Sequence, residues 1–173
     1  MPKAIEAART THRVLIGVTL AVVACFWLLA FLDRQLFVVH FYESLIYLAI
    51  SALLLRFNDR WACMLGMLAP AAWLVLILVP AAWTLLGVLV GSPPVFLRTA
   101  SLLGRLQRPS SAAIIVEAAT LILSASMLLL CLSAWKMRPA ARLRNTFLTC
   151  VITVAVYYGV LIVWLLKWNP VSA

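Results

Sequence analysis

The stretch that decides the fold is WACMLGMLAPAAWLVLILVPAAWTLLGVLV, which runs from Trp61 to Val90 and contains no Asp, Glu, Lys or Arg. About 20 predominantly apolar residues cross the hydrocarbon core of a bilayer as a helix, whereas two helices and a turn need roughly twice that number. The stretch is too short to cross twice, so it predicts one long transmembrane helix. Pro70 and Pro80 each remove a backbone hydrogen-bond donor, and we therefore expect this helix to be kinked or tilted.

The composition of the chain agrees with a protein that resides in lipid. Of its 173 residues, 66% are hydrophobic and 11% are charged, and the mean hydropathy is +1.10. No loop between apolar runs is long enough to form a soluble domain, so residues 1–173 predict a single transmembrane domain. The net charge of +9 comes from Lys and Arg near the ends of the runs, where anionic lipid head groups lie. The charge therefore indicates contact with the bilayer and its anionic lipids, and not the binding of nucleic acid.

The apolar runs predict an all-α integral membrane protein, built as a bundle of five transmembrane helices. The first run follows a basic N-terminal segment, as in a signal peptide. It is longer than the apolar part of a signal peptide, however, and it ends at Asp33 and Arg34 without a cleavage pattern of small residues, so we expect it to be a span. The five predicted spans lie approximately at residues 14–32, 36–55, 61–90, 112–135 and 145–166.

Residues 93–107, between the third and fourth runs, predict one short amphipathic helix. Ser92 is a suitable N-cap, and Pro93 and Pro94 suit the first helical turn. The arginines of this segment recur at helical spacing, and leucine and valine side chains occupy the other face. We expect the helix to lie in the membrane interface. The arginines expected to contact lipid head groups are Arg98, Arg105 and Arg108.

The distribution of basic residues predicts the orientation. With five spans, nine Lys and Arg residues fall on the side of the N-terminus and five fall on the other side. Cytoplasmic loops carry the excess of positive charge, so the N-terminus is expected in the cytoplasm and the C-terminus outside. The preference for Arg over Lys and the spans rich in Ala and Leu favour a bacterial protein, and hence the bacterial inner membrane.

Two acidic residues, Glu43 and Glu117, fall inside predicted spans, where an ionisable side chain costs several kcal/mol unless it meets water, a partner or the bundle interior. Their two spans run in the same direction, which places both acids in one leaflet. Polar residues spaced by three or four positions extend from them and predict a polar seam shared by the second, fourth and fifth spans. The seam either holds the bundle together by interhelical hydrogen bonds or forms a pocket that handles protons or a substrate. Its predicted members are His40, Glu43, Tyr47, Ser51, Glu117, Thr120, Ser124, Thr149, Thr153 and Tyr157.

His40 raises the question of a cofactor. It lies one turn before Glu43 and is expected to bond that carboxyl group or the head-group layer. His12 lies at the opposite membrane face, so the two histidines cannot hold one haem between them. A single axial bond from His40 to a pigment, or to a haem shared with another subunit, is the alternative, and the sequence leaves the cofactor unknown.

The four cysteines all lie in apolar runs and form no C-x-x-C pair. Three of them, Cys63, Cys131 and Cys150, have similar predicted depths, which would permit thiolate ligation of a metal. Zinc would need a fourth ligand, and none is evident, so we interpret the cysteines as small hydrophobic residues and predict no metal site. Phosphate-binding loops, H-E-x-x-H and other catalytic motifs are absent from the sequence, and no catalytic residue is predicted.

Three classes of function agree with these features. The first is a non-catalytic subunit or assembly component of a membrane complex, which accounts for the short loops. The second is a small carrier that takes up protons or cations at Glu43 and Glu117. The third is a lipid-modifying enzyme that holds phosphate with the arginines of residues 93–107. Five short spans are few for a transporter that acts alone. We therefore expect the chain to associate with other membrane subunits or with a second copy of itself.

Overall fold

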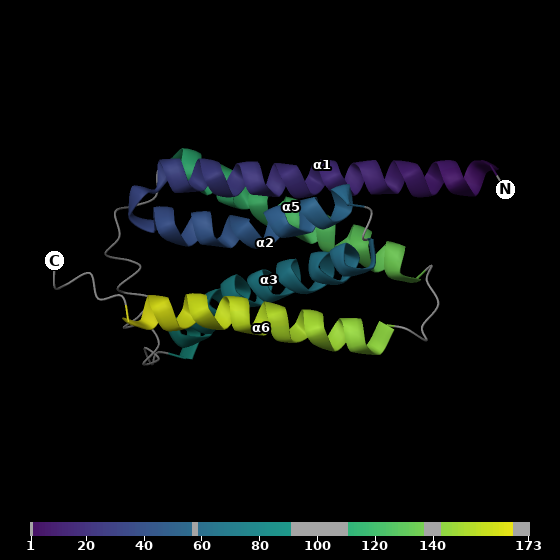
Figure 1. Ribbon diagram of the computed structural model, residues 1–173. Coiled ribbons are helices and arrows are strands. Elements are labelled where there is room, and N and C mark those ends of the chain that lie inside the picture. Colours follow the sequence, from purple (N-terminus) through teal and green to yellow (C-terminus); the bar gives the residue numbers. More distant parts are fainter. Residues whose placement is uncertain (1, 57–58, 91–110, 137–142, 168–173) are drawn as a thin grey trace.

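The computed structural model describes residues 2–56, 59–90, 111–136 and 143–167 (Figure 1). They form five long helices, α1 (Pro2–Leu32), α2 (Phe37–Leu55), α3 (Asp59–Val90), α5 (Ser111–Lys136) and α6 (Leu143–Lys167). A single 3-10 turn, η1 (Arg34–Leu36), joins α1 to α2. Within these described ranges the fold is all-helical, without strands. The interfacial helix predicted at residues 93–107 lies outside the described residues.

Each long helix contains a segment that is long and apolar enough to cross a membrane, so the chain is a multi-pass membrane protein. These segments are Thr10–Leu32, Phe37–Leu55, Arg60–Leu78, Ser111–Ala134 and Thr146–Trp164. The prediction of five spanning helices is confirmed at this level. In lipid every backbone polar group must be satisfied within its own segment, and therefore the length of an apolar run is sufficient to locate a helix.

Helix α1 begins earlier than the sequence predicts, and α3 is continuous as predicted. Helix α1 begins at Pro2, well before the apolar run, because Pro suits a first helical turn and the following residues include the strong helix formers Ala, Glu and Arg. Its first turns project beyond the neighbouring helices (Figure 1). Helix α3 is one continuous helix through both Pro70 and Pro80, as its length required.

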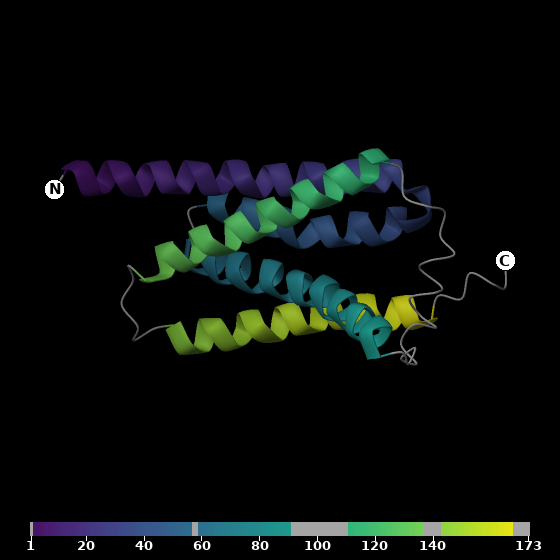
Figure 2. The same ribbon diagram turned by 180° about the vertical axis from the view of Figure 1, so that it is seen from behind.

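The helices pack in a defined order. Helix α1 lies against α2 and α5, and α3 lies against α2, α5 and α6. Seen from behind, α5 crosses α1 and α3 obliquely, while α6 lies at the side of the bundle remote from α1, where the later part of α3 crosses it (Figure 2). Because the number of crossings is odd, α1 begins and α6 ends at opposite ends of the bundle (Figure 1).

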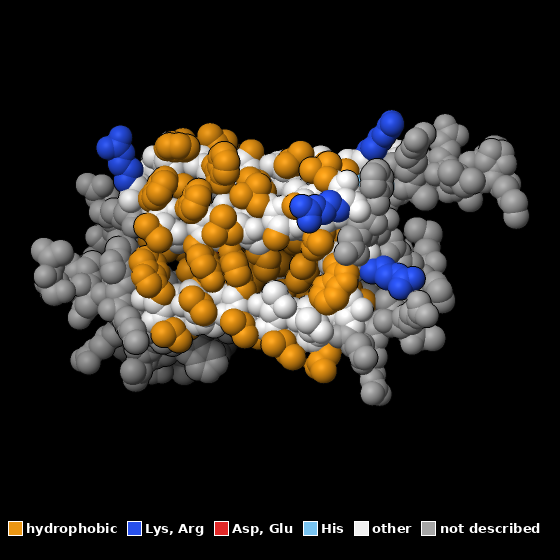
Figure 3. All heavy atoms as spheres, viewed as in Figure 1, with side chains coloured by type: hydrophobic (Ala, Val, Ile, Leu, Met, Phe, Trp, Pro, Cys, Tyr) orange, Lys and Arg blue, Asp and Glu red, His pale blue; other side chains and the backbone are white. Residues whose placement is uncertain are grey.

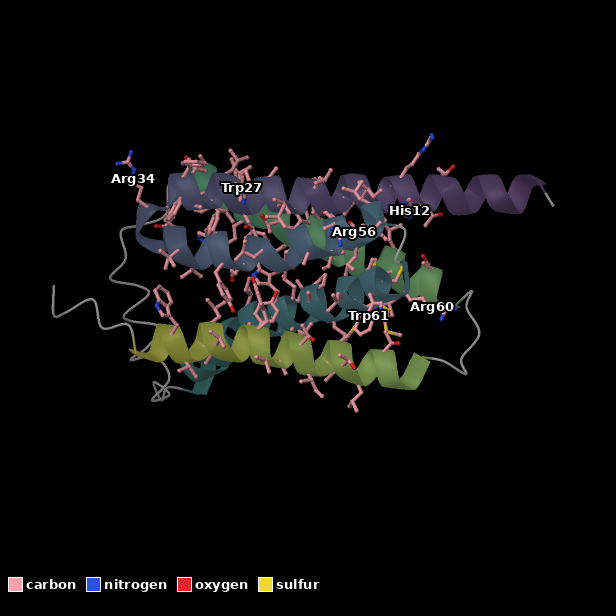
Figure 4. The ribbon with its side chains drawn as sticks, in the orientation of Figure 1. His12, Trp27, Arg34, Arg56, Arg60 and Trp61 are labelled. Carbon is pink, nitrogen blue, oxygen red and sulfur yellow. The ribbon has the colours of Figure 1, made fainter. Side chains whose placement is uncertain are left out.

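The core is apolar and so is most of the outer face. Phe26, Ile50, Leu54 and Met64 are completely buried. Hydrophobic side chains also cover the surface between the two ends of the bundle, and Lys and Arg side chains lie toward those ends (Figure 3). Arg34 stands at one end, and Arg56 and Arg60 stand toward the other (Figure 4). This distribution is the one expected when lipid tails contact the middle of the bundle and head groups contact its ends.

Candidate intramembrane polar site

The carboxyl group of Glu43 has a hydrogen-bonding neighbour at each of its oxygens. The indole Nε1–H of Trp73 donates to Oε1 over 3.1 Å, and Nδ1 of His40 lies 3.2 Å from Oε2. The side chains of His40 and Glu43 are only 17% and 12% exposed. His40 and Glu43 are three residues apart on α2 and therefore share a face, whereas Trp73 reaches the carboxyl group from α3. The expected contact between His40 and Glu43 is present, and the Trp73 bond ties α2 to α3.

Aromatic packing holds Trp73 in position. The ring of Phe26, on α1, meets the Trp73 ring edge-on with centroids 5.4 Å apart, and it meets the Tyr47 ring at 5.5 Å. Phe26 and Tyr47 are fully buried and Trp73 is 2% exposed. Edge-on aromatic pairs add stability beyond the area that they bury. The donor to Glu43 is therefore oriented before any ligand or partner arrives.

Tyrosines attach α6 to the rest of the bundle. Tyr42 of α2 and Tyr157 of α6 stack with ring centroids 4.5 Å apart, and each hydroxyl donates to the backbone carbonyl of the other residue. The Tyr158 hydroxyl donates to the carbonyl of Ala69 on α3 over 3.3 Å. On the α1 side, the Trp27 indole N–H donates to the hydroxyl of Ser44 over 3.1 Å. Polar side chains thus join α2 to α1, α3 and α6.

Three further buried hydroxyl groups form no such hydrogen bond within the described residues. The hydroxyls of Tyr47, Ser51 and Ser124 have no hydrogen-bond partner of normal geometry among the described residues. Tyr47 and Ser124 are 0% exposed and Ser51 is 3% exposed. Tyr47 faces Ser124 of α5 and Tyr158 of α6, and it lies one helical turn after Glu43 and one before Ser51. A buried hydroxyl without a partner costs about 1–3 kcal/mol, so a cluster of three requires an explanation.

The structure brings together only part of the predicted seam. His40, Glu43, Tyr47, Ser51 and Tyr157 lie in or beside the site just described, and Thr120 and Ser124 are buried on α5. Thr120 bonds the carbonyl of Val116 on its own helix. By contrast, Glu117, Thr149 and Thr153 are exposed.

Glu117 takes no part in the hydrogen bonds of the Glu43 site. It shares a helical face with Thr120 and Ser124, as the spacing predicts, but most residues in the first two turns of α5, apart from Ala113 and Val116, are exposed. Those turns belong to a helix that crosses α1 obliquely (Figure 2). A side chain on the inward face of α5 is therefore buried only where the neighbouring helices are close to it.

The remaining sequence predictions concern metal and phosphate binding. Among the described residues no group of three or more His, Cys, Asp or Glu side chains is arranged to hold a metal. The predicted lipid-contacting residues Arg98, Arg105 and Arg108 lie outside the described residues.

Sequence reasoning missed Trp73, the residue that donates to Glu43. It also missed Ser44, Tyr42 and Tyr158. An indole or phenol inside a span is easily counted as apolar, although each carries a donor that seeks a partner when buried. Pairing each buried acid with every such donor on neighbouring spans would have placed Trp73 among the candidates.

Comparison of the chain with models of known protein families, with functionally characterised proteins and with solved structures finds no match.

Proposed function

We propose that this multi-pass protein is a non-catalytic subunit of a bacterial inner-membrane complex, and that the first turns of α5 contact its partner. The observation that carries this proposal is the different environment of the two intramembrane acids. Glu43 is enclosed by donors of its own bundle, whereas Glu117 is exposed beside Ile114 and Ile115, which are 54% and 69% exposed. A carboxyl group on an apolar outer face is costly in lipid and is stabilised when a polar group of a neighbouring subunit covers it.

The internal contacts of Glu43 support the same proposal. Its two neighbours, Trp73 and His40, belong to the bundle itself. The hydrogen bond from Trp73 joins α3 to α2, so the carboxyl group stabilises the contact between these two helices. A carrier built on both acids would need them in one site, and Glu117 is not part of the Glu43 site. We expect the partner to contribute a membrane helix, from a second copy or from a different subunit, that carries a hydrogen-bond donor at the depth of Glu117.

The test is the assembly state of the full chain purified in a mild detergent and measured by native mass spectrometry. A defined assembly is expected, and Glu117→Leu should convert it to the single chain. Thr153→Val is the matched control, because Thr153 is also exposed but already bonds the carbonyl of Thr149 on its own helix. If wild type is a single chain, or if Glu117→Leu leaves the assembly intact, the subunit proposal fails at this surface.

A second candidate function, proton uptake at Glu43, is favoured by the hydroxyls of Tyr47, Ser51 and Ser124. Glu43, Tyr47 and Ser51 follow one another at single-turn intervals along α2, and hydroxyls can pass a proton along such a row. Proteoliposomes containing a pH-sensitive dye would separate the two candidates. Glu43→Gln and Tyr47→Phe should each abolish proton flux under the carrier proposal. Under the subunit proposal, wild type shows no flux above empty vesicles, and Glu43→Gln leaves the assembly unchanged.

A further inference from the structure

Two cysteines that are far apart in the sequence meet in the bundle interior. Cys63 of α3 and Cys131 of α5 are in hydrogen-bonding contact through their side chains, and both are present as thiols. They are 3% and 0% exposed. The sequence places Cys63, Cys131 and Cys150 at similar depths, and the structure brings the first two of them together.

Met127 and Gly66 pack beside this pair. Met127 is one turn before Cys131 on α5 and is 0% exposed. Its thioether sulfur accepts a hydrogen bond from the Thr19 hydroxyl over 3.8 Å, while its methyl carbon and the Cys131 sulfur both press against Gly66 of α3. A Cβ atom at Gly66 would lie 2.7 Å from Cys131 Sγ and 3.1 Å from Met127 Cε. A Cβ at Gly66 would force Cys131 to shift, so α3 and α5 are in close contact at Gly66, which lies one turn after Cys63 on the same face of α3.

The chemistry of this group selects the kind of cation. Thiolate and thioether sulfurs are soft ligands, which favour Cu(I) among the biological cations. Zn²⁺ would need four ligands, and the described residues contain no third His, Cys, Asp or Glu at this place. A monovalent cation bound by one thiolate leaves no net charge, which matters because an uncompensated charge is costly in a low-dielectric interior.

The pair lies near one end of the bundle. Cys63 lies four residues after the start of α3, and Cys131 lies five residues before the end of α5. At a rise of about 1.5 Å per residue, both sulfurs lie within about 8 Å of the helix ends. They are therefore close to the membrane surface on the side where α1 begins, and far from the Glu43 site.

We propose that Cys63 and Cys131 form a binding site for one Cu(I) ion. On binding, the S–H bond of one thiol breaks, a Cu–S bond forms, and the proton leaves to water at the nearby membrane surface. The other thiol donates a lone pair as a neutral ligand, and copper remains Cu(I) throughout. This site is independent of the assembly surface at Glu117 and of the Glu43 site.

The test is an anaerobic titration of the full-length protein in detergent, in which Cu(I) is transferred from a coloured Cu(I) chelator of known affinity. One Cu(I) per chain is expected. Cys63→Ser and Cys131→Ser should each weaken binding by at least about 100-fold, since changes in the second shell alone cost about 10–100-fold. Cys25→Ser and Cys150→Ser are the matched controls and should bind as wild type does. Gly66→Ala, which retains every sulfur, should weaken binding because its Cβ displaces Cys131 Sγ.

A second measurement keeps the proposal testable if a cysteine variant fails to fold. X-ray absorption of the copper-loaded wild-type protein should show only sulfur in the first shell, and Cu(I) should protect Cys63 and Cys131, but not Cys25, from alkylation. The proposal is overturned if wild type does not compete with the chelator, if the Cys63→Ser/Cys131→Ser double variant still binds one Cu(I), or if the first shell contains nitrogen or oxygen.

Discussion

Replacing Trp73 by Phe tests whether the Glu43 carboxyl group fastens α2 to α3. The change removes the indole N–H that donates to Glu43 Oε1 over 3.1 Å, and it retains an aromatic ring for the edge-on contact with Phe26. A hydrogen bond to a charged acceptor is worth about 1.5–3 kcal/mol in soluble proteins. Side-chain hydrogen bonds within membrane bundles average about 0.6 kcal/mol and reach about 1.7. Because the Glu43 side chain is only 12% exposed, we expect a coupling between the two residues of about 1–2 kcal/mol, at the upper end of the membrane range.

The assay is a double-mutant cycle of the free energy of unfolding in mixed detergent micelles, with Trp73→Phe, Glu43→Leu and the double variant. The cycle separates the hydrogen bond from the loss of indole volume, which is common to both Trp73 variants. Trp27→Phe is the matched control: it removes an indole bond to Ser44 at the more exposed α1–α2 contact, and it should show no coupling to Glu43. A Trp73–Glu43 coupling below about 0.3 kcal/mol, within the usual limits of additivity, would refute the reasoning.

Three further predictions concern packing, orientation and lipid contact. Gly66→Ala should lower the free energy of unfolding by about 1–3 kcal/mol because its Cβ would lie 2.7 Å from Cys131 Sγ, whereas Gly159→Ala, with nothing within 4 Å, should be neutral or stabilising by up to about 1 kcal/mol. Reporter fusions within residues 92–111 and after Ala173 should both report an external location, and a cytoplasmic signal from either would reverse the proposed orientation. Neutralising the three arginines between residues 93 and 108 should weaken the association of anionic lipid with the detergent-purified protein by about 1 kcal/mol per charge, and retention of anionic lipid equal to that of wild type would contradict this. These arginines are Arg98, Arg105 and Arg108.

The sequence alone was sufficient to predict the spanning helices. The run from Trp61 to Val90 predicts one helix and not two, and α3 is a single helix over Asp59–Val90. This succeeds because a helix in lipid satisfies its backbone hydrogen bonds within its own segment, so apolar length determines the element without reference to its neighbours. The contact of His40 with Glu43 could be predicted for the same local reason, since both residues lie within one turn of α2.

Only the tertiary structure decided which polar groups meet. Helical spacing places Glu117 on one face with Ser124, yet Ser124 is buried and Glu117 is exposed. Spacing likewise gives no reason to pair Glu43 with Trp73, and the similar depths of Cys63, Cys131 and Cys150 do not say which two of them meet. Periodicity fixes the direction of a side chain about the axis of its own helix. The distance to the next helix, however, depends on the order and crossing angles of the helices, which follow from the packing of the whole bundle.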